Sequence, residues 1–526
     1  MADPAAPAAG AGSAWPAWRQ ALALAALAVL AYLPGIGAQE FVGTEDFRAR
    51  IAAETVASEH PLLPTYYGRP ILTKPPLHYW ALGGVQELAG TRAPWSARLL
   101  SLAALAATVA MSGAAARAAG GPRAGWIAGM GYLLGAYILK NGVNAEIDPL
   151  FACFVVGAVL AWWQAQGGES GQTGQGGTAR RCVLYAALAG LLAGLAVLTK
   201  GPALVPFAAG AAYATWRCGR KPTWAVVAAA VLTFAPPALL WPLALHQLDP
   251  EVRALAITEG PGMFFAWDGR FLVRTLLFPV TLFCACLPFT VPALLRLRAP
   301  GRAALDRYLM AAVGGAFVLL LLNATKSTRY LLPCFPLLVV AGVLRLELLA
   351  RTGPFVRAVC VLFLLAAAVA FPLTFSTLSF SGALALAALA TAATAGFLLA
   401  RRAPAAALAL LLVPARALFT QVYVPRWEAG EDSVRAGVAE LAEQLAGARN
   451  LGVATLETPR ILDPLQKRIT YYDHPKDLAE AVRGGARFDA LLLGTQEFEH
   501  EVPGFAPAGF VRVGDKHVAV LLPETP

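Results

Sequence analysis

Three carboxylates stand at the edges of long apolar runs in this sequence, where charged side chains are costly. Glu45 and Asp46 are adjacent, and Asp148 opens a later apolar run. Carboxylates beside a bilayer persist mostly where they line a cavity or do chemistry. A carboxylate can act as a general base, and two carboxylates can share a divalent cation. We predict catalytic roles for all three and a metal site at Glu45 and Asp148, although Asp148 before Pro149 is also typical of a helix N-cap.

Basic residues form the second set of side chains that could take part in chemistry. Lys74 precedes Pro75 and Pro76, which hold an extended segment, and Lys200 and the Lys326–Arg329 turn lie between later apolar runs. Arginine offers bidentate geometry to a phosphate, and lysine offers a point charge. These residues predict an anion site, with Tyr66 and Tyr330 as further substrate contacts. The alternative for each basic residue is snorkelling or pairing with a local carboxylate.

The elements that position these residues are membrane helices. The 526 residues are 58% hydrophobic and 14% charged, whereas globular chains carry roughly 25% charged residues. A helix needs about 20 mostly apolar residues to cross a bilayer. The sequence predicts about thirteen spans, at 19–39, 96–117, 124–140, 148–165, 182–199, 201–216, 224–243, 276–295, 308–323, 330–348, 355–375, 381–400 and 403–422.

The distribution of arginine and lysine predicts the orientation of these spans. If the N-terminus is cytoplasmic, most basic clusters fall in loops on one side, including Arg180–Arg181 and Arg401–Arg402. Short loops rich in Lys and Arg are cytoplasmic. The net charge of +10 is therefore explained by topology, and we expect no nucleic-acid partner. The opposite face then holds the loops 40–95, 140–148 and 244–275, together with six basic residues: Lys74, Lys140, Lys200, Arg270, Lys326 and Arg329.

Three domains follow from these patterns. A disordered tail is expected over 1–18, and a transmembrane domain over 19–422, with the catalytic first outer loop at 40–95 and a flexible cytoplasmic linker at 166–179. The composition changes after this region. Residues 450–456 and 488–493 are typical of buried strands, 433–446 and 478–482 of helices, and 510–522 of a hairpin around Gly514–Asp515. We therefore expect a small extracytoplasmic α/β domain over 423–526.

Four motifs in this order carry a family resemblance. They are IAAETVAS…YYGRPILTKPPLHYW, NAEIDPLFACF, LTKGP and KSTRYLLPCFP. Together they resemble the bacterial aminoarabinose transferases and the related protein O-mannosyltransferases, which are polyprenyl-phosphate-dependent glycosyltransferases of the C-type membrane fold. The resemblance covers residues 19 to about 350, and the C-terminal region mainly in layout.

The resemblance implies roles for individual residues. The family's first outer loop carries an Asp-Glu pair, whose Asp falls on Thr44 and whose Glu falls on Glu45, with Asp46 one position later. The base is then either Glu45 or Asp46. Asp148 matches the family's second acid. The family's basic residues near the lipid phosphate correspond to Lys74, Lys200, Lys326 and Arg329.

The implied activity is inverting transfer of a sugar from a polyprenyl-phosphate donor to a lipid, glycan or protein acceptor. It would occur at the periplasmic face of the bacterial inner membrane, among membrane lipids, with a divalent cation as the candidate cofactor. Two other classes remain open. A transporter or flippase would place charges near the bilayer midplane, whereas these charges lie at span ends. A non-catalytic relative would fit the loss of the acid at position 44.

Overall fold

The structure is a computed structural model, and it describes most of the chain. The described residues are 16–71, 74–170, 177–248, 250, 269–285, 287–294, 303–324, 326–348, 350–374, 380–423, 434, 436–456, 458–494, 502–513 and 516–524. Several expectations fall outside them, including most of the tail 1–18, the centre of the linker 166–179, residues 251–268 of the loop 244–275 and the turn at Gly514–Asp515.

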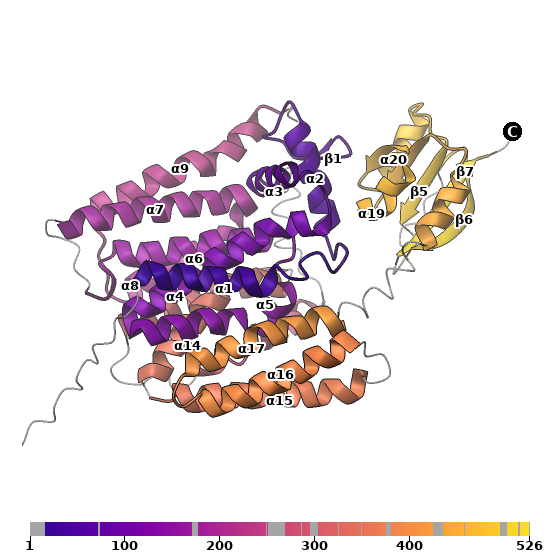
Figure 1. Cartoon of the computed structure of the whole chain (residues 1–526). Helices are drawn as coiled ribbons and strands as arrows, with labels where there is room; N and C mark the ends of the chain where they lie inside the picture. The colour runs from indigo at the N-terminus through magenta and orange to yellow at the C-terminus, as the bar shows by residue number, and fades with distance from the viewer. Residues whose placement is uncertain are drawn as a thin grey trace, which may run out of the picture.

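The larger part of the molecule is a bundle of long helices that run side by side (Figure 1). Its first half contains α1 (Ala17–Tyr32), α4 (Pro94–Leu133), α5 (Ala136–Asn141), α6 (Ile147–Ala165), η1 (Gly168–Ser170), α7 (Gly177–Lys200), η2 (Gly201–Leu204), α8 (Val205–Arg217) and α9 (Trp224–His246). Its second half contains α11 (Phe271–Ala285), α12 (Thr290–Leu294), α13 (Ala304–Leu322), η3 (Thr328–Leu331), α14 (Cys334–Leu348), α15 (Thr352–Thr374), α16 (Phe380–Leu399), α17 (Pro404–Leu418) and η5 (Phe419–Tyr423).

These helices account for the apolar runs of the sequence. In the described part of the chain, eight helical stretches are long and apolar enough to cross a membrane. Two of them extend over 40 residues: 94–133 covers the predicted span 96–117 and the first part of 124–140, and 178–217 covers 182–199 and 201–216. The first bends at Gly121, whose φ of 83° is left-handed, just before Pro122. The chain is a multi-pass membrane protein, and the predicted polytopic helical class is confirmed.

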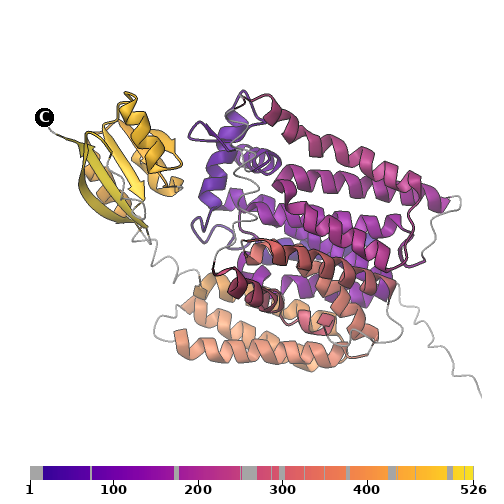
Figure 2. The same cartoon turned by 180° about the vertical axis from the view of Figure 1, so that it is seen from behind.

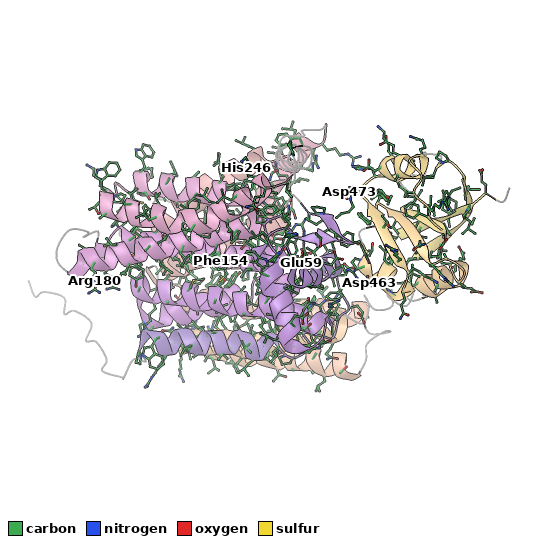
Figure 3. All side chains as sticks on the ribbon, turned by 90° about the horizontal axis from the view of Figure 1, so that it is seen from above. Glu59, Phe154, Arg180, His246, Asp463 and Asp473 are labelled. Atoms are coloured by element: carbon green, nitrogen blue, oxygen red, sulfur yellow. The ribbon has the colours of Figure 1, made fainter. Side chains whose placement is uncertain are left out.

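The first outer loop covers one end of this bundle. It contains α2 (Glu45–Ala57), a short hairpin of β1 (Thr65–Tyr66) and β2 (Arg69–Pro70), and α3 (Leu77–Ala89). α2 packs on α3, and α3 on α4 and α7. Figure 3 shows that Glu59, just after α2, lies toward the C-terminal domain, whereas Arg180 lies at the opposite end of the bundle. The predicted separation of acidic and basic loops therefore corresponds to two ends of the bundle.

The C-terminal domain is a five-stranded mixed sheet, visible from both sides in Figures 1 and 2. Its elements are β3 (Asn450–Ala454), α19 (Pro459–Leu462), η6 (Asp463–Leu465), β4 (Arg468–Tyr472), α20 (Pro475–Arg483), β5 (Ala490–Gly494), β6 (Phe505–Val513) and β7 (Lys516–Pro523). The strand order is β4-β3-β5-β7-β6, with β3 parallel to β4 and β5 and with an antiparallel β6–β7 pair. The predicted strands at 450–456 and 488–493, the helix at 478–482 and the strand pairing of the hairpin are confirmed, and 436–444 within the predicted helix 433–446 is helical; β4 was not predicted.

Candidate functional site

Segments far apart in the sequence meet at the end of the bundle beneath the first outer loop. Glu146, which immediately precedes α6, connects α2 to η3: its carboxylate lies 3.9 Å from Arg48 and 3.9 Å from Arg329. Asp148, in the first turn of α6, pairs with Lys200 at the end of α7. The predicted neighbourhood of Asp148, Lys200 and Arg329 is therefore present in the structure, although the role of each residue is still a prediction.

Lys74 belongs to the same electrostatic environment. Burial and the positive charges of Arg48, Lys200 and Arg329 together lower the pKa of Lys74 from 10.5 to about 8, while Asp148 opposes them. Like charges and desolvation both disfavour the ammonium form. Four cationic side chains therefore converge on one region, as a site for an anion requires.

Helix ends and neighbouring rings hold these cations in place. Lys200 ends α7, and Gly201 follows with a left-handed φ of 59°, which turns the chain into η2. The Lys200 Nζ lies 4.7 Å from the centroid of the Tyr330 ring, within cation–π range. Arg48 donates a hydrogen bond of 2.7 Å to the hydroxyl of Tyr79 in α3. The predicted Tyr330 therefore contacts a cation of this cluster.

Glu45 has a different environment. Its side chain has no exposed surface and forms a bidentate pair with Arg98 of α4, at 3.0 and 2.6 Å. It also accepts hydrogen bonds from the backbone amides of Val42 and Ala145. Arg98 in turn donates to the carbonyls of Ile36, Gln39 and Glu40. This network fixes the loop after α1 against α4, and it occupies both Glu45 oxygens.

Asp46, the neighbour of Glu45, points elsewhere. It is buried, and its Oδ1 accepts a hydrogen bond from the backbone amide of Phe47. Asp46 also lines a cavity of about 200 Å³ with Arg92 and with Pro459 and Asp463 of the C-terminal domain. Glu45 and Asp46 therefore have different neighbours: Glu45 is paired with Arg98, and Asp46 lines the cavity.

Glu146 is the carboxylate that the sequence reasoning missed. Its Oε1 and Oε2 lie 2.8 and 2.9 Å from the hydroxyl oxygen of Thr44, and the Thr44 amide also donates to Oε1. The side chain is 17% exposed, whereas that of Asp148 is 7% exposed. A signal was present in the motif NAEIDP, because Glu146 stands two residues before Asp148 at the start of the same helix. Arg98 could also have been noticed in the sequence, because it is a charged residue inside the predicted span 96–117.

Lys326 and Tyr66, two other residues predicted to contact the substrate, each have different neighbours from the cations around Lys74. Lys326 donates to the carbonyls of Leu321 and Asn323, and its Nζ lies 4.5 Å from the centroid of the Phe271 ring. Tyr66 is buried within the first outer loop, where its ring packs on that of Phe47 and on that of Tyr471 in the C-terminal domain. Their predicted contacts with substrate stay predictions.

The predicted metal ligands are already paired with cations. Glu45 binds the Arg98 guanidinium, and Asp148 binds the Lys200 ammonium. Among the described residues, no group of three or more His, Cys, Asp or Glu side chains could hold a metal ion. The Glu45–Asp148 donor set does not fit a resident cation, because each carboxylate would have to exchange its basic partner for the metal. The metal requirement stays a prediction, and no step below depends on it.

A second hollow lies where the first outer loop faces the C-terminal domain. This cavity of about 560 Å³ is lined by Arg50, Arg92 and Lys467 among others. Arg50 connects the two sides, with bonds to Glu54 of 2.6 Å and to Asp463 of 3.0 Å. The C-terminal domain therefore contacts the loop that bears the site.

The chain was compared with known protein families and with curated proteins. Residues 44–235, which include Arg48, Lys74, Glu146, Asp148 and Lys200, match the dolichyl-phosphate-mannose-protein mannosyltransferase family. Over 295 residues the chain is 26% identical to the undecaprenyl phosphate-alpha-4-amino-4-deoxy-L-arabinose arabinosyl transferase of Edwardsiella ictaluri (strain 93-146). That alignment covers 55% of this chain and 52% of the relative, so the chain matches about half the length of this curated relative.

Solved structures share the fold over nearly the whole chain. The ArnT protein of Cupriavidus metallidurans bound to undecaprenyl phosphate superposes with a TM-score of 0.69 at 17% identity, covering 96% of this chain and 98% of that one. Its apo form gives a TM-score of 0.65 at 17% identity with the same coverage. The Archaeoglobus fulgidus oligosaccharyltransferase in complex with zinc and sulfate gives 0.50 at 13% identity, covering 90% and 68%. The predicted resemblance to the aminoarabinose transferase and protein O-mannosyltransferase families, and to their fold, is confirmed.

Proposed function

We propose that this protein is a glycosyltransferase that moves a sugar from a polyprenyl-phosphate donor to an acceptor hydroxyl or phosphate. The observation that carries the proposal is the convergence of Arg48, Lys74, Lys200 and Arg329 at one end of the bundle. The carboxylates of Glu146 and Asp148 lie among these four cations, so positive charge is in excess, and such an excess is unfavourable unless a further anion joins it. The similarity to relatives named for undecaprenyl phosphate and dolichyl-phosphate-mannose supports a lipid phosphate as that anion.

The proposed chemistry is a single displacement. The acceptor oxygen attacks the anomeric carbon of the sugar and forms a new C–O bond. The bond between that carbon and the phosphate oxygen breaks, and its electron pair passes to the leaving polyprenyl phosphate. In-line attack inverts the anomeric configuration. A carboxylate of the site takes the acceptor's proton.

The cations act where charge develops. The leaving phosphate gains negative charge as the C–O bond breaks, so prearranged cations stabilise the transition state more than the ground state. Arg329 supplies a planar guanidinium, and Lys74 and Lys200 supply ammonium groups. The Asp148 carboxylate positions the Lys200 ammonium through their ion pair.

We further propose that the end of the bundle bearing the site faces the periplasm of a bacterial inner membrane. The opposite end, where Arg180 lies, carries loops rich in arginine (Figure 3). Such loops stay in the cytoplasm. A lipid-linked donor would then enter from the outer leaflet, and the C-terminal domain would lie on the acceptor side.

Transfer by the purified, full-length protein tests the proposal. The protein in lipid nanodiscs receives synthetic polyprenyl-phosphate hexose or 4-aminopentose, with a lipid A-type glycolipid, a polysaccharide or a Ser/Thr peptide as acceptor. We expect one donor–acceptor pair to give a product with the mass of one added sugar. A Lys200→Ala/Arg329→Ala variant is expected to lose both donor binding and transfer, while Lys140→Ala, an exposed lysine elsewhere on the same face, keeps both. Wild-type protein that neither binds nor uses any donor would contradict the proposal.

A further inference from the structure

We propose that Glu146 is the general base of this site. The assignment rests on the proposed function and names the group that accepts the proton. The observation behind it is the contact between Glu146 and Thr44, 102 residues apart, beside the cations Arg48 and Arg329.

The surroundings of the other three carboxylates argue for this choice. Glu45 is fully buried, and both of its oxygens accept from the Arg98 guanidinium and from backbone amides. Asp46 lines the cavity that Arg50 and Arg92 share with the C-terminal domain, and one of its oxygens accepts a hydrogen bond from the Phe47 amide. Asp148 is occupied by Lys200. A base must reach its proton at hydrogen-bond distance, and a fully enclosed carboxylate cannot do so without breaking its own network.

Glu146 meets that requirement. Its side chain is 17% exposed, and each of its two cation contacts is at 3.9 Å, beyond a direct hydrogen bond. The bonds inside hydrogen-bond range come from Thr44, which fixes the carboxylate through its hydroxyl and its amide. One edge of the carboxylate is therefore held in place, and the group keeps access to solvent and to an entering acceptor.

The neighbouring cations connect this base to the leaving group. Arg48 and Arg329 lie beside Glu146 and also act on Lys74, which we assign to the donor phosphate. The donor phosphate and the base would thus share the same positive environment. In the proposed step, the acceptor's O–H bond breaks, its proton passes to a Glu146 oxygen, and its electron pair forms the new bond to the anomeric carbon.

The placement of Thr44 makes the assignment testable by transplanting the base. The Thr44 hydroxyl oxygen lies within 2.9 Å of both Glu146 oxygens. An aspartate at position 44 would therefore bring a carboxylate to the same space from the other side. We compare Glu146→Gln, Thr44→Asp/Glu146→Gln and, as a control, Glu59→Gln, an exposed acid near the end of α2.

Two quantities are measured for each folded variant: affinity for the polyprenyl-phosphate sugar and the rate of transfer. We expect Glu146→Gln to lower the rate by about 10²- to 10⁴-fold, the usual loss on removing a general base, with donor affinity within about threefold. The double variant should transfer sugar at least tenfold faster than Glu146→Gln, and Glu59→Gln should transfer it at the wild-type rate. A role limited to positioning Arg48 and Arg329 would instead lower donor affinity together with the rate.

The contrary outcomes are distinct from failure of the proposed function. If Glu146→Gln transfers sugar at the wild-type rate, the assignment is wrong and the proposed function stands. If folded Glu146→Gln loses donor affinity together with rate, and the double variant regains neither, Glu146 is a binding or structural residue instead. If the wild-type protein transfers no sugar at all, the proposed function fails and this assignment fails with it.

Discussion

The lowered pKa of Lys74 predicts that donor binding weakens at alkaline pH. Burial and the charges of Arg48, Lys200 and Arg329 bring the pKa of Lys74 from 10.5 to about 8. As the pH rises through 8, the free protein therefore loses the positive charge that we assign to the donor phosphate. A phosphodiester keeps its single negative charge over this range, so the change belongs to the protein.

The magnitude follows from the pKa. If only the protonated lysine binds, the apparent Kd is multiplied by one plus the ratio of deprotonated to protonated Lys74. The apparent Kd should then rise about 11-fold at pH 9 and about 100-fold at pH 10 relative to its low-pH value. The same shift has a consequence for stability. Between about 8 and 10.5 the unfolded chain binds more protons than the folded one, so the contribution of Lys74 to stability increases with pH.

Donor affinity measured between pH 7 and 10, by titration of a fluorescent polyprenyl-phosphate sugar into nanodiscs, checks this prediction. The matched variant is Lys74→Arg, because a guanidinium stays charged throughout this range. We expect its affinity to fall much less between pH 8 and 10 than that of the wild type. A flat wild-type profile, or an identical fall in both proteins, would refute the assignment of Lys74 to the phosphate.

Three further predictions concern the rest of the site. Glu45→Gln should destabilise the fold by about 3 to 5 kcal/mol, because the buried arginine partner loses its counter-charge; a melting temperature equal to wild type in detergent would contradict this. Lys200→Ala should weaken donor affinity by roughly 10- to 150-fold, the equivalent of about 1.5 to 3 kcal/mol for a charged hydrogen bond, whereas Lys140→Ala should change it less than twofold; equal effects would count against a defined phosphate site. In a cysteine-free background, Glu59→Cys should react with a membrane-impermeant maleimide in spheroplasts and Arg180→Cys only after lysis; the reverse pattern would invert the proposed orientation.

Most of the fold could be predicted from the sequence because apolar length and helix breakers dominate it. The helix at 45–57, the turn after Lys200 and the strands at 450–454 and 490–494 all follow from local patterns. The edge strand β4 could not be recognised, because its residues alternate weakly and only one of the five is buried. Its place in the sheet depends on pairing with β3, a contact between distant residues.

The basic residues of the candidate site could be predicted from the sequence, whereas its carboxylate Glu146 was missed. Lys74, Lys200 and Arg329 could be grouped because a topology rule places their loops on one face. Arg48 and Arg98 could not be assigned, because their roles depend on partners far along the chain: Arg98 reaches Glu45 across 53 residues, and Arg48 reaches Glu146 across 98. Sequence spacing alone does not specify such pairs.

The acidic residues Glu45 and Asp46 show why neighbours in sequence can differ in function. Successive residues of an α-helix are rotated by about 100°, and Glu45 and Asp46 are the first two residues of α2. One is directed to Arg98 of α4, and the other lines the cavity that reaches the C-terminal domain. Arg48 and Arg329, two of the cations around Lys74, lie beside Glu146. Thr44, one residue before Glu45, contacts Glu146 there. The acid that the family resemblance implies at position 44 therefore has a spatial counterpart in Glu146, which a linear alignment of the first outer loop cannot reveal.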